Sequence, residues 1–255
     1  MPESRSTDDW RRIDVRVVPL PRPFHWLALG AKDLWRCPLP GLVHGFASAA
    51  FGALLITIFG QRFWLLAGAF SGFLIVAPLV ATGLYAVSSA LQGGGRAGLA
   101  TALQAWRPKN SRLVLFGLLL ALAGTGWVLT SAGLITRFAP APVTDPVAFL
   151  RVVVLAPDSW LFEAWLLLGG VLAAPVFASS VVAIPLLLDR PLGVRTAVFT
   201  SWRVVMANPV TMALWALLIM GLSVLGILSG LLGLIVIVPV LAHASWHAYQ
   251  DLVAP

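Results

Sequence analysis

Two of the four histidines in this chain of 255 residues lie four positions apart, in the stretch HASWHAYQD. On a helix, this spacing places the imidazoles of His243 and His247 on one face, one turn apart. Neutral imidazole is a common ligand of copper, zinc and haem iron. The pair therefore has three interpretations: a bound metal or haem, a polar helix end where the chain meets water, or a group that senses protonation. His44 would add a third imidazole if its segment lies beside that of His243.

The elements that carry these histidines are strongly apolar. The chain is 59% hydrophobic and 11% charged, whereas soluble domains have about 25% charged residues. This composition predicts an integral membrane protein, in which each span needs about 20 residues. We expect a disordered polar tail at residues 1–24 and one transmembrane domain at residues 25–255. Six segments qualify as spans, at about 42–60, 63–90, 112–135, 160–188, 210–228 and 230–248.

The basic residues predict how the spans are oriented. Of the 17 Lys and Arg residues, seven lie in residues 1–41, four in 91–112 and three in 189–209. The positive-inside rule places these regions, and with them both termini, in the cytoplasm. The net charge of +7 is therefore explained by topology, and we expect no nucleic-acid partner.

A Trp-Arg pair precedes the first, third and fifth expected spans, in LWRCPLPG, AWRPKN and SWRVVMANP. Each pair ends a short amphipathic stretch, and such helices lie in the headgroup plane, where Trp favours the interface and Arg contacts phosphate. The predicted fold is therefore all-α, with six transmembrane helices arranged as three hairpins, each preceded by an amphipathic interfacial helix. The residues expected to contact lipid or a partner are Trp35, Arg36, Trp106, Arg107, Trp202 and Arg203.

The even-numbered spans share a second pattern, in which a proline is followed four residues later by a polar residue. These polar residues are Thr82, Ser179 and His243. Proline removes a backbone hydrogen bond inside a span, and a nearby polar group can satisfy the freed carbonyl. A polar layer of these three residues would line a path for a small solute.

Three stretches resemble a known family: Ala77 to Ala90, Pro185 to Pro209, and Pro239 to Val253. They are similar to the DUF2189 family of predicted bacterial integral membrane proteins of unknown function. The resemblance extends over roughly residues 25–253, and HASWHAYQDLV is its most specific part. It implies a multi-pass protein of the bacterial cytoplasmic (inner) membrane with six spans, and it implies no substrate, cofactor or catalytic residue.

We therefore expect a non-enzymatic integral membrane protein, a scaffold or accessory subunit whose partners are membrane lipid and another membrane complex. No cofactor and no catalytic residue are expected for this function. The first alternative is a haem- or copper-binding respiratory accessory factor that uses His243, His247 and His44, the first two as metal ligands. The second alternative is a small-solute transporter or channel built on the polar layer.

Overall fold

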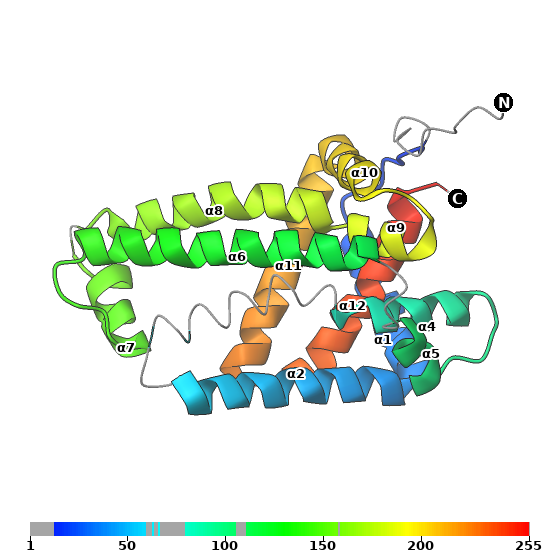
Figure 1. Ribbon diagram of the computed structural model, residues 1–255, viewed down its shortest axis with the longest axis horizontal. Coiled ribbons are helices and arrows are strands. Elements are labelled where there is room, and N and C mark those ends of the chain that lie inside the picture. The colour runs from blue at the N-terminus through cyan, green and yellow to red at the C-terminus, as the bar shows by residue number, and fades with distance from the viewer. Residues whose placement is uncertain are drawn as a thin grey trace. The chain divides into compact units, whose positions relative to one another are not determined.

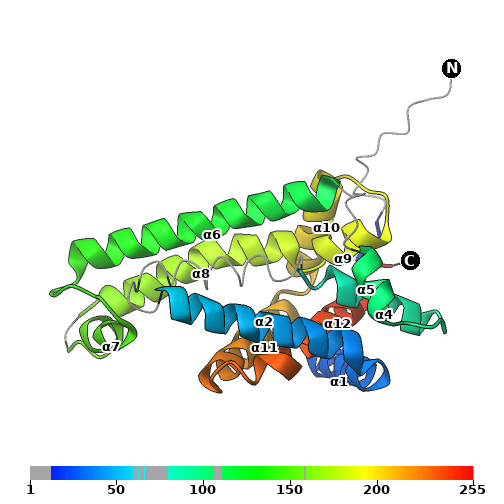
Figure 2. The ribbon, with the colours of Figure 1, turned by 60° about the horizontal axis from the view of Figure 1, so that its bottom comes forward.

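The computed structural model describes residues 13–59, 63, 66, 80–105, 111–157 and 159–254. Over these residues the chain is helical apart from its connections and one isolated β-bridge, between Val15 and Val253, which confirms the all-α class. The chain forms two compact units, whose helices are drawn in Figures 1 and 2. Unit 1 comprises Met1–Ala50, Pro78–Phe116 and Phe177–Pro255, and unit 2 comprises Phe51–Ala77 and Gly117–Val176.

Four helical stretches among the described residues are long and apolar enough to cross a membrane: Pro38–Ile58, Arg112–Phe138, Leu161–Asp189 and Pro209–Leu228. They are formed by α2 (Pro38–Phe59), α6 (Ser111–Phe138), α8 (Leu161–Ser180) with α9 (Ala183–Asp189), and α11 (Pro209–Leu228). These match the first, third, fourth and fifth expected spans.

The second and the sixth expected spans are not among these four candidate spans. Most of the second, 63–90, lies outside the described residues, and its end forms α4 (Thr82–Gln92). The sixth corresponds to α12 (Leu234–Leu252), whose last three turns read HASWHAYQDL and carry several polar residues. These polar turns keep α12 out of the set of candidate spans, so the structure supports four spans in its described part rather than six.

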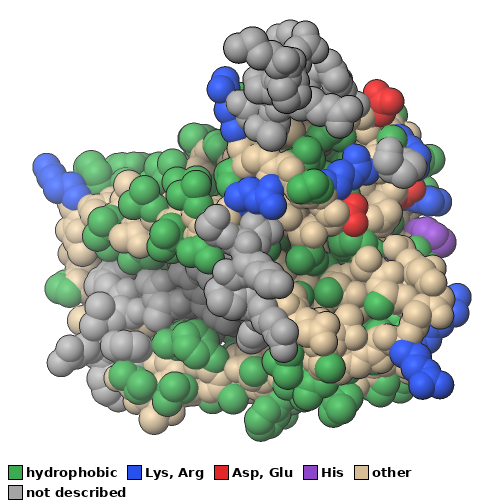
Figure 3. Space-filling view, turned by 45° about the vertical axis from the view of Figure 1, so that its right-hand side comes forward, with side chains coloured by type: hydrophobic (Ala, Val, Ile, Leu, Met, Phe, Trp, Pro, Cys, Tyr) green, Lys and Arg blue, Asp and Glu red, His purple; other side chains and the backbone are tan. Residues whose placement is uncertain are grey.

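The candidate spans expose large apolar side chains. Leu122 of α6, Leu167 of α8 and Leu228 of α11 are 70%, 70% and 76% exposed. Figure 3 shows apolar side chains over much of the face that it draws, with few acidic ones among them. Exposed apolar area on this scale is typical of a surface that faces lipid. The chain is thus a membrane-integral protein with several apolar helices.

Unit 1 is built around α12, which is contacted by α1 (Arg22–Arg36), α4 and α11. Figures 1 and 2 show α1 beside the second half of α12. The two helices approach closely because Gly30 has no side chain: a Cβ there would lie 2.5 Å from the carbonyl oxygen of Val240. One turn earlier on the same buried face of α1, the Trp26 ring meets the Trp215 ring of α11 edge to face, with centroids 5.6 Å apart.

The short helices expected before the spans are present. Helix α1 precedes α2, α5 (Leu99–Ala105) precedes α6, and α10 (Val194–Ala207) precedes α11. Helix α10 buries a face of small side chains that includes Thr196 and Thr200, while Phe199 and Met206 are 41% and 66% exposed. A helix that buries hydroxyls and exposes apolar side chains suits an apolar solvent better than water.

Residues 13–24, which we expected in a disordered tail, are ordered. The amide of Arg16 donates to the carbonyl of Leu252 (2.9 Å), and the amide of Ala254 donates to the carbonyl of Asp14 (3.0 Å). The Asn208 side chain accepts from the amide of Val18 (2.8 Å) and donates to the carbonyl of Arg16 (3.0 Å). These hydrogen bonds pair backbone groups of the segment with distant residues. A prediction from composition cannot detect such contacts. Residues 1–12 lie outside the described residues.

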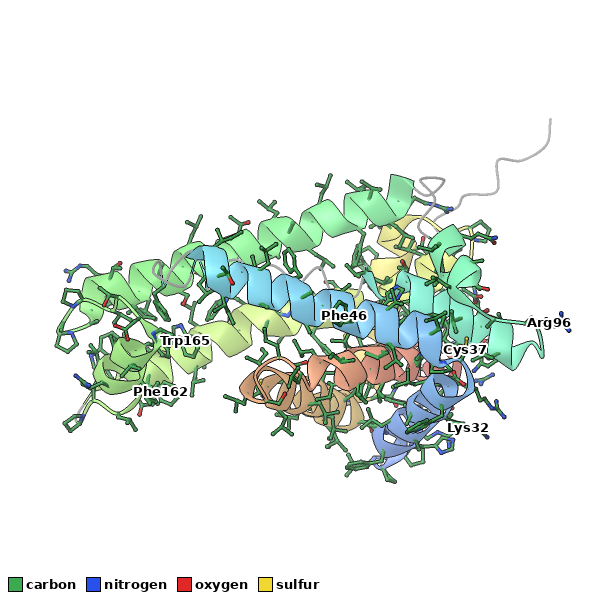
Figure 4. All side chains as sticks on the ribbon, turned by 90° about the horizontal axis from the view of Figure 1, so that it is seen from below. Lys32, Cys37, Phe46, Arg96, Phe162 and Trp165 are labelled. Carbon is green, nitrogen blue, oxygen red and sulfur yellow. The ribbon has the colours of Figure 1, made fainter. Side chains whose placement is uncertain are left out.

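In unit 2, parts of α6 and α8 pack together with α7 (Pro146–Phe149) and the π-helix η2 (Leu150–Val154). Trp165 is at the centre of this packing, next to Phe162 on α8 in Figure 4. Its indole N–H donates to the hydroxyl of Ser131 on α6 (2.7 Å), and its ring meets Phe149 edge to face at 5.3 Å. The buried core residues are Ile135, Val143, Val153 and Leu161.

Candidate functional site

The histidine pair of α12 lies in the interior of unit 1. His243 and His247 are 0% and 7% exposed, and Trp246 and Tyr249 between and beyond them are 2% and 1% exposed. The interpretation of this stretch as a polar helix end at the water line is therefore wrong. Helices α1 and α4 cover these turns of α12 and supply polar partners for them.

Hydrogen bonds occupy both ring nitrogens of His247. Nε2 lies 2.8 Å from Oδ2 of Asp33 on α1, and Nδ1 lies 3.0 Å from Nε2 of Gln92 on α4. The indole N–H of Trp246 donates to Oε1 of Gln92 (2.9 Å), which turns the NH₂ group of Gln92 toward His247. An amide NH₂ can only donate, so Nδ1 accepts and the hydrogen of the neutral ring is on Nε2. His247 thus has no nitrogen left to join His243 in binding a metal.

Asp33 is the acceptor at the centre of the cluster. It is 4% exposed, and its Oδ2 also accepts a hydrogen bond from the Ser88 hydroxyl (2.8 Å). Burial raises the pKa of the carboxyl, but the hydrogen bonds donated by His247 and Ser88, together with the electrostatic effect of His247 and His243, lower it by more, so that it ends below its ordinary value. The cluster therefore holds a buried carboxylate that is hydrogen-bonded to His247 and Ser88.

His243 is linked to the carboxylate through Ser88. Its Nδ1 lies 2.7 Å from the Ser88 oxygen, whose single hydrogen is donated to Asp33. The hydroxyl must therefore accept from Nδ1–H, which leaves the lone pair of the neutral ring on Nε2. Nε2 is buried and has no hydrogen-bond partner among the described residues.

The first turns of α2 face this nitrogen. A Cβ on Gly41 would lie 3.8 Å from Nε2 of His243, and His44, one turn further, is close enough to act on His243 electrostatically. His44 is 6% exposed, and its Nδ1 lies 2.7 Å from the carbonyl of Pro40. Because a carbonyl only accepts, Nδ1 carries the hydrogen and Nε2 the lone pair. The structure thus brings the three predicted histidines into one region of unit 1.

These groups do not form an ordinary multi-ligand metal centre. In the part of the chain that the structure describes, no set of three or more His, Cys, Asp or Glu side chains is arranged to hold a metal ion. Asp33 and His247 are hydrogen-bonded to each other and to their neighbours on α4.

The three residues of the predicted polar layer have different surroundings. Ser179 accepts a hydrogen bond from the indole N–H of Trp202 (2.9 Å). Thr82 is buried in the first turn of α4. The hydroxyl that contacts His243 belongs to Ser88, one of the residues that the sequence did not single out.

The Trp-Arg pairs are not equivalent. Trp35 is 84% exposed and Arg36 is exposed beside it. Trp202 is 37% exposed, while Arg203 donates to the carbonyl of Ile13 (2.8 Å) and so holds the N-terminal segment. The pair of Trp106 and Arg107 lies outside the described residues.

Asp33, Ser88 and Gln92 are the members of the cluster that sequence reasoning missed. One signal was available for Asp33: Trp26, Gly30 and Asp33 recur at helical spacing and share the buried face of α1. An acid within an otherwise apolar face indicates a buried partner. The sequence alone does not identify that partner, since His247 lies 214 positions away.

Comparison with known proteins agrees with the membrane assignment. The model of the DUF2189 family, described as predicted integral membrane proteins, matches residues 65–189. No curated protein and no solved structure matches the chain. The match is narrower than the resemblance over 25–253 that we expected, and it includes Ser88 and Gln92 but not the histidines of α2 and α12. Over residues 65–189 the chain is therefore similar to DUF2189, a family of predicted integral membrane proteins.

Proposed function

We propose that this protein is a non-enzymatic scaffold or accessory subunit of a membrane complex, and that the end of α1 is its contact surface. The observation that carries this proposal is the pair Trp35 and Arg36. The Trp35 side chain is 84% exposed and stands beside the exposed Arg36, immediately before the candidate span of α2. Exposed Trp and Arg are the residues most enriched where one protein surface binds another.

The wider arrangement that we propose has six spans in the bacterial inner membrane, with both termini in the cytoplasm. Helices α1, α5 and α10 each precede a candidate span, and all three follow or include basic stretches. This order supports three interfacial helices on the cytoplasmic side, where the positive-inside rule places Lys and Arg. In this arrangement Trp35 lies at headgroup depth, within reach of lipid phosphate and of a neighbouring membrane protein.

A photo-crosslinking amino acid at position 35, in cells that express the full chain, tests the contact surface. We expect a discrete crosslinked product with a second protein, and we expect Arg36→Glu to reduce it by removing a charge-assisted contact. The matched control is the same photo-crosslinker in place of Leu122, an exposed apolar residue of the α6 candidate span. That position should give lipid adducts.

Two results would contradict the proposal. Lipid adducts alone at both positions would show that Trp35 is a membrane anchor and not a docking residue. Equal protein crosslinks from Trp35 and Leu122 would show that crowding in the bilayer, rather than this surface, brings the two proteins together. Topology is tested separately by labelling single cysteines placed in each connection from one side of sealed vesicles.

A further inference from the structure

The connection between α6 and α8 in unit 2 has the composition of a buried segment. Residues 146–156, which form α7, η2 and the two residues after them, read PVAFLRVVVLA, with Arg151 as the single polar side chain. Connections that run through water are usually built from polar and turn-forming residues. A helical segment that is apolar on all sides is instead expected to have apolar surroundings on all sides.

The protein itself covers one face of this segment. Val153 is 1% exposed and belongs to the core of unit 2, together with Ile135 near the end of α6 and Leu161 at the start of α8. The Phe149 ring meets Trp165 of α8 edge to face, with centroids 5.3 Å apart. Figure 1 shows α7 at the ends of α6 and α8 that it connects. These contacts fix which side of the segment faces the two spans.

A second face of the segment carries apolar side chains that the described residues leave exposed. Val147, Leu150 and Leu155 are 62%, 48% and 67% exposed, and we call these three residues the outer face. Arg151, next to Leu150 in the sequence, is also exposed. Apolar side chains exposed together in this way are typical of a surface with an apolar partner.

The position of the outer face identifies that partner. The stretch Arg112–Phe138 has 27 residues, and at about 1.5 Å per residue it is roughly 40 Å long, close to the thickness of a bilayer with its headgroups. Phe138 therefore reaches the headgroup region. Its ring contacts that of Trp160, just before α8, with centroids 5.1 Å apart, so the two spans end at one level. Both rings are exposed, as in the aromatic belt of membrane proteins.

The flanking charges fit the same level of the membrane. The Arg137 guanidinium lies 5.2 Å from the centroid of the Phe138 ring, and Arg137 and Arg151 are both exposed. Arginine at the end of an apolar segment places its charge among lipid headgroups. Because the bilayer surrounds both spans at this level, lipid reaches the outer face without the recruitment of a partner. We propose that the outer face inserts into the bilayer surface at the end of α6, as a membrane-binding segment rather than a loop in water.

The test measures the depth of spin labels in the full-length protein, reconstituted into vesicles of phosphatidylcholine and phosphatidylglycerol. Single cysteines replace Val147, Leu150 and the control residue Thr144 in a Cys37→Ser background, because Cys37 is the only native cysteine. Collisions with oxygen, which dissolves in lipid, are compared with collisions with a nickel chelate, which stays in water. Labels at 147 and 150 should collide mainly with oxygen and lie roughly 5–10 Å below the phosphates. The label at Thr144, an exposed residue bonded to the Asp145 carboxylate, should collide mainly with the nickel chelate.

Two results at these positions would overturn the proposal. Equal collision ratios at 144, 147 and 150 would show that the outer face is no deeper than the polar start of the segment. Labels at 147 and 150 shielded from both reagents would show that protein, and not lipid, covers the face. Spectral broadening that is relieved by excess unlabelled protein would then identify the cover as a second copy of the chain.

The proposal goes beyond the contact surface at Trp35 and rests on α6 and α8 crossing the membrane. A label at Leu167, 70% exposed in the candidate span of α8, should therefore collide mainly with oxygen and lie deeper than the label at Leu150. Collisions of the Leu167 label mainly with the nickel chelate would remove that span and overturn the proposal. None of these labels reports on Trp35, so the crosslinking experiment at that residue remains a separate test.

Discussion

Replacing Asp33 by alanine is expected to destabilise unit 1 by about 2–6 kcal/mol. One carboxylate oxygen accepts hydrogen bonds from both His247 Nε2 and Ser88 Oγ, each at 2.8 Å. Both donors are buried, at 7% and 0% exposure. A buried donor left without an acceptor costs about 1–3 kcal/mol, and the substitution leaves two.

Asp33→Asn removes the negative charge but keeps a hydrogen-bond acceptor, so it measures the contribution of the charge alone. Asparagine has nearly the same shape and retains one carbonyl oxygen for the two donors. A hydrogen bond to a charged group contributes about 1 kcal/mol more to stability than one between neutral groups. With two such bonds, Asp33→Asn is expected to destabilise the protein by roughly 2 kcal/mol. Unfolding by sodium dodecyl sulfate in mixed micelles, followed by tryptophan fluorescence, measures both variants. The control is Asp14→Ala at an exposed site, where a change within about 0.5 kcal/mol is expected.

The contribution of Asp33 depends on pH in a direction that follows from its lowered pKa. The pKa of an unfolded Asp is about 3.9, and that of Asp33 in the folded protein is lower. Its stabilising effect is therefore complete above the unfolded pKa and is lost as the pH falls through the folded one. The difference between wild type and Asp33→Ala should be present at pH 7 and shrink below about pH 4. A stability of Asp33→Ala equal to that of Asp14→Ala at pH 7 would refute this reasoning.

Three further predictions test other contacts. Gly45→Ala should destabilise by about 1–3 kcal/mol in the same assay, because its Cβ would lie 2.1 Å from the carbonyl oxygen of Ile235; Gly133→Ala, with open space around it, is the control. Asn208→Ala should release the segment around Val18, because the amide of Val18 and the carbonyl of Arg16 lose their hydrogen-bond partner. Limited proteolysis should then cleave this segment faster than in the wild type. Burial raises the pKa of the Cys37 thiol, so its alkylation at pH 7 should be slower than that of free cysteine and should increase with pH.

The helices were more predictable from sequence than the contacts between them. Long apolar runs identified α2, α6, α8 and α11, because the length and hydropathy of a span are local properties. The same reasoning failed for α12, whose polar turns resemble a water-exposed helix end and are buried by α1 and α4.

The site was predictable in part. The four-residue spacing identified His243 and His247, and the structure places them on neighbouring turns of one buried face. The sequence did not show that His247 and His243 have different partners. The partners of His247 are Asp33 and Gln92, which lie 214 and 155 positions away from it in the sequence. Helix periodicity indicates which residues share a face, but it does not indicate which distant helix covers that face.

The packing of α1 on α12 affects how the protein is made. The carboxylate of Asp33 is synthesised 214 residues before His247, the imidazole that donates to it. At about 5–20 residues per second, the ribosome needs roughly 10–40 s to cover that distance. Through this interval α1 has an ionised side chain and no α12 to bury it, so it must stay at a polar boundary while the candidate spans insert. Helix α12 thus completes the burial of α1, and unit 1 cannot reach its final packing before His247 has been made.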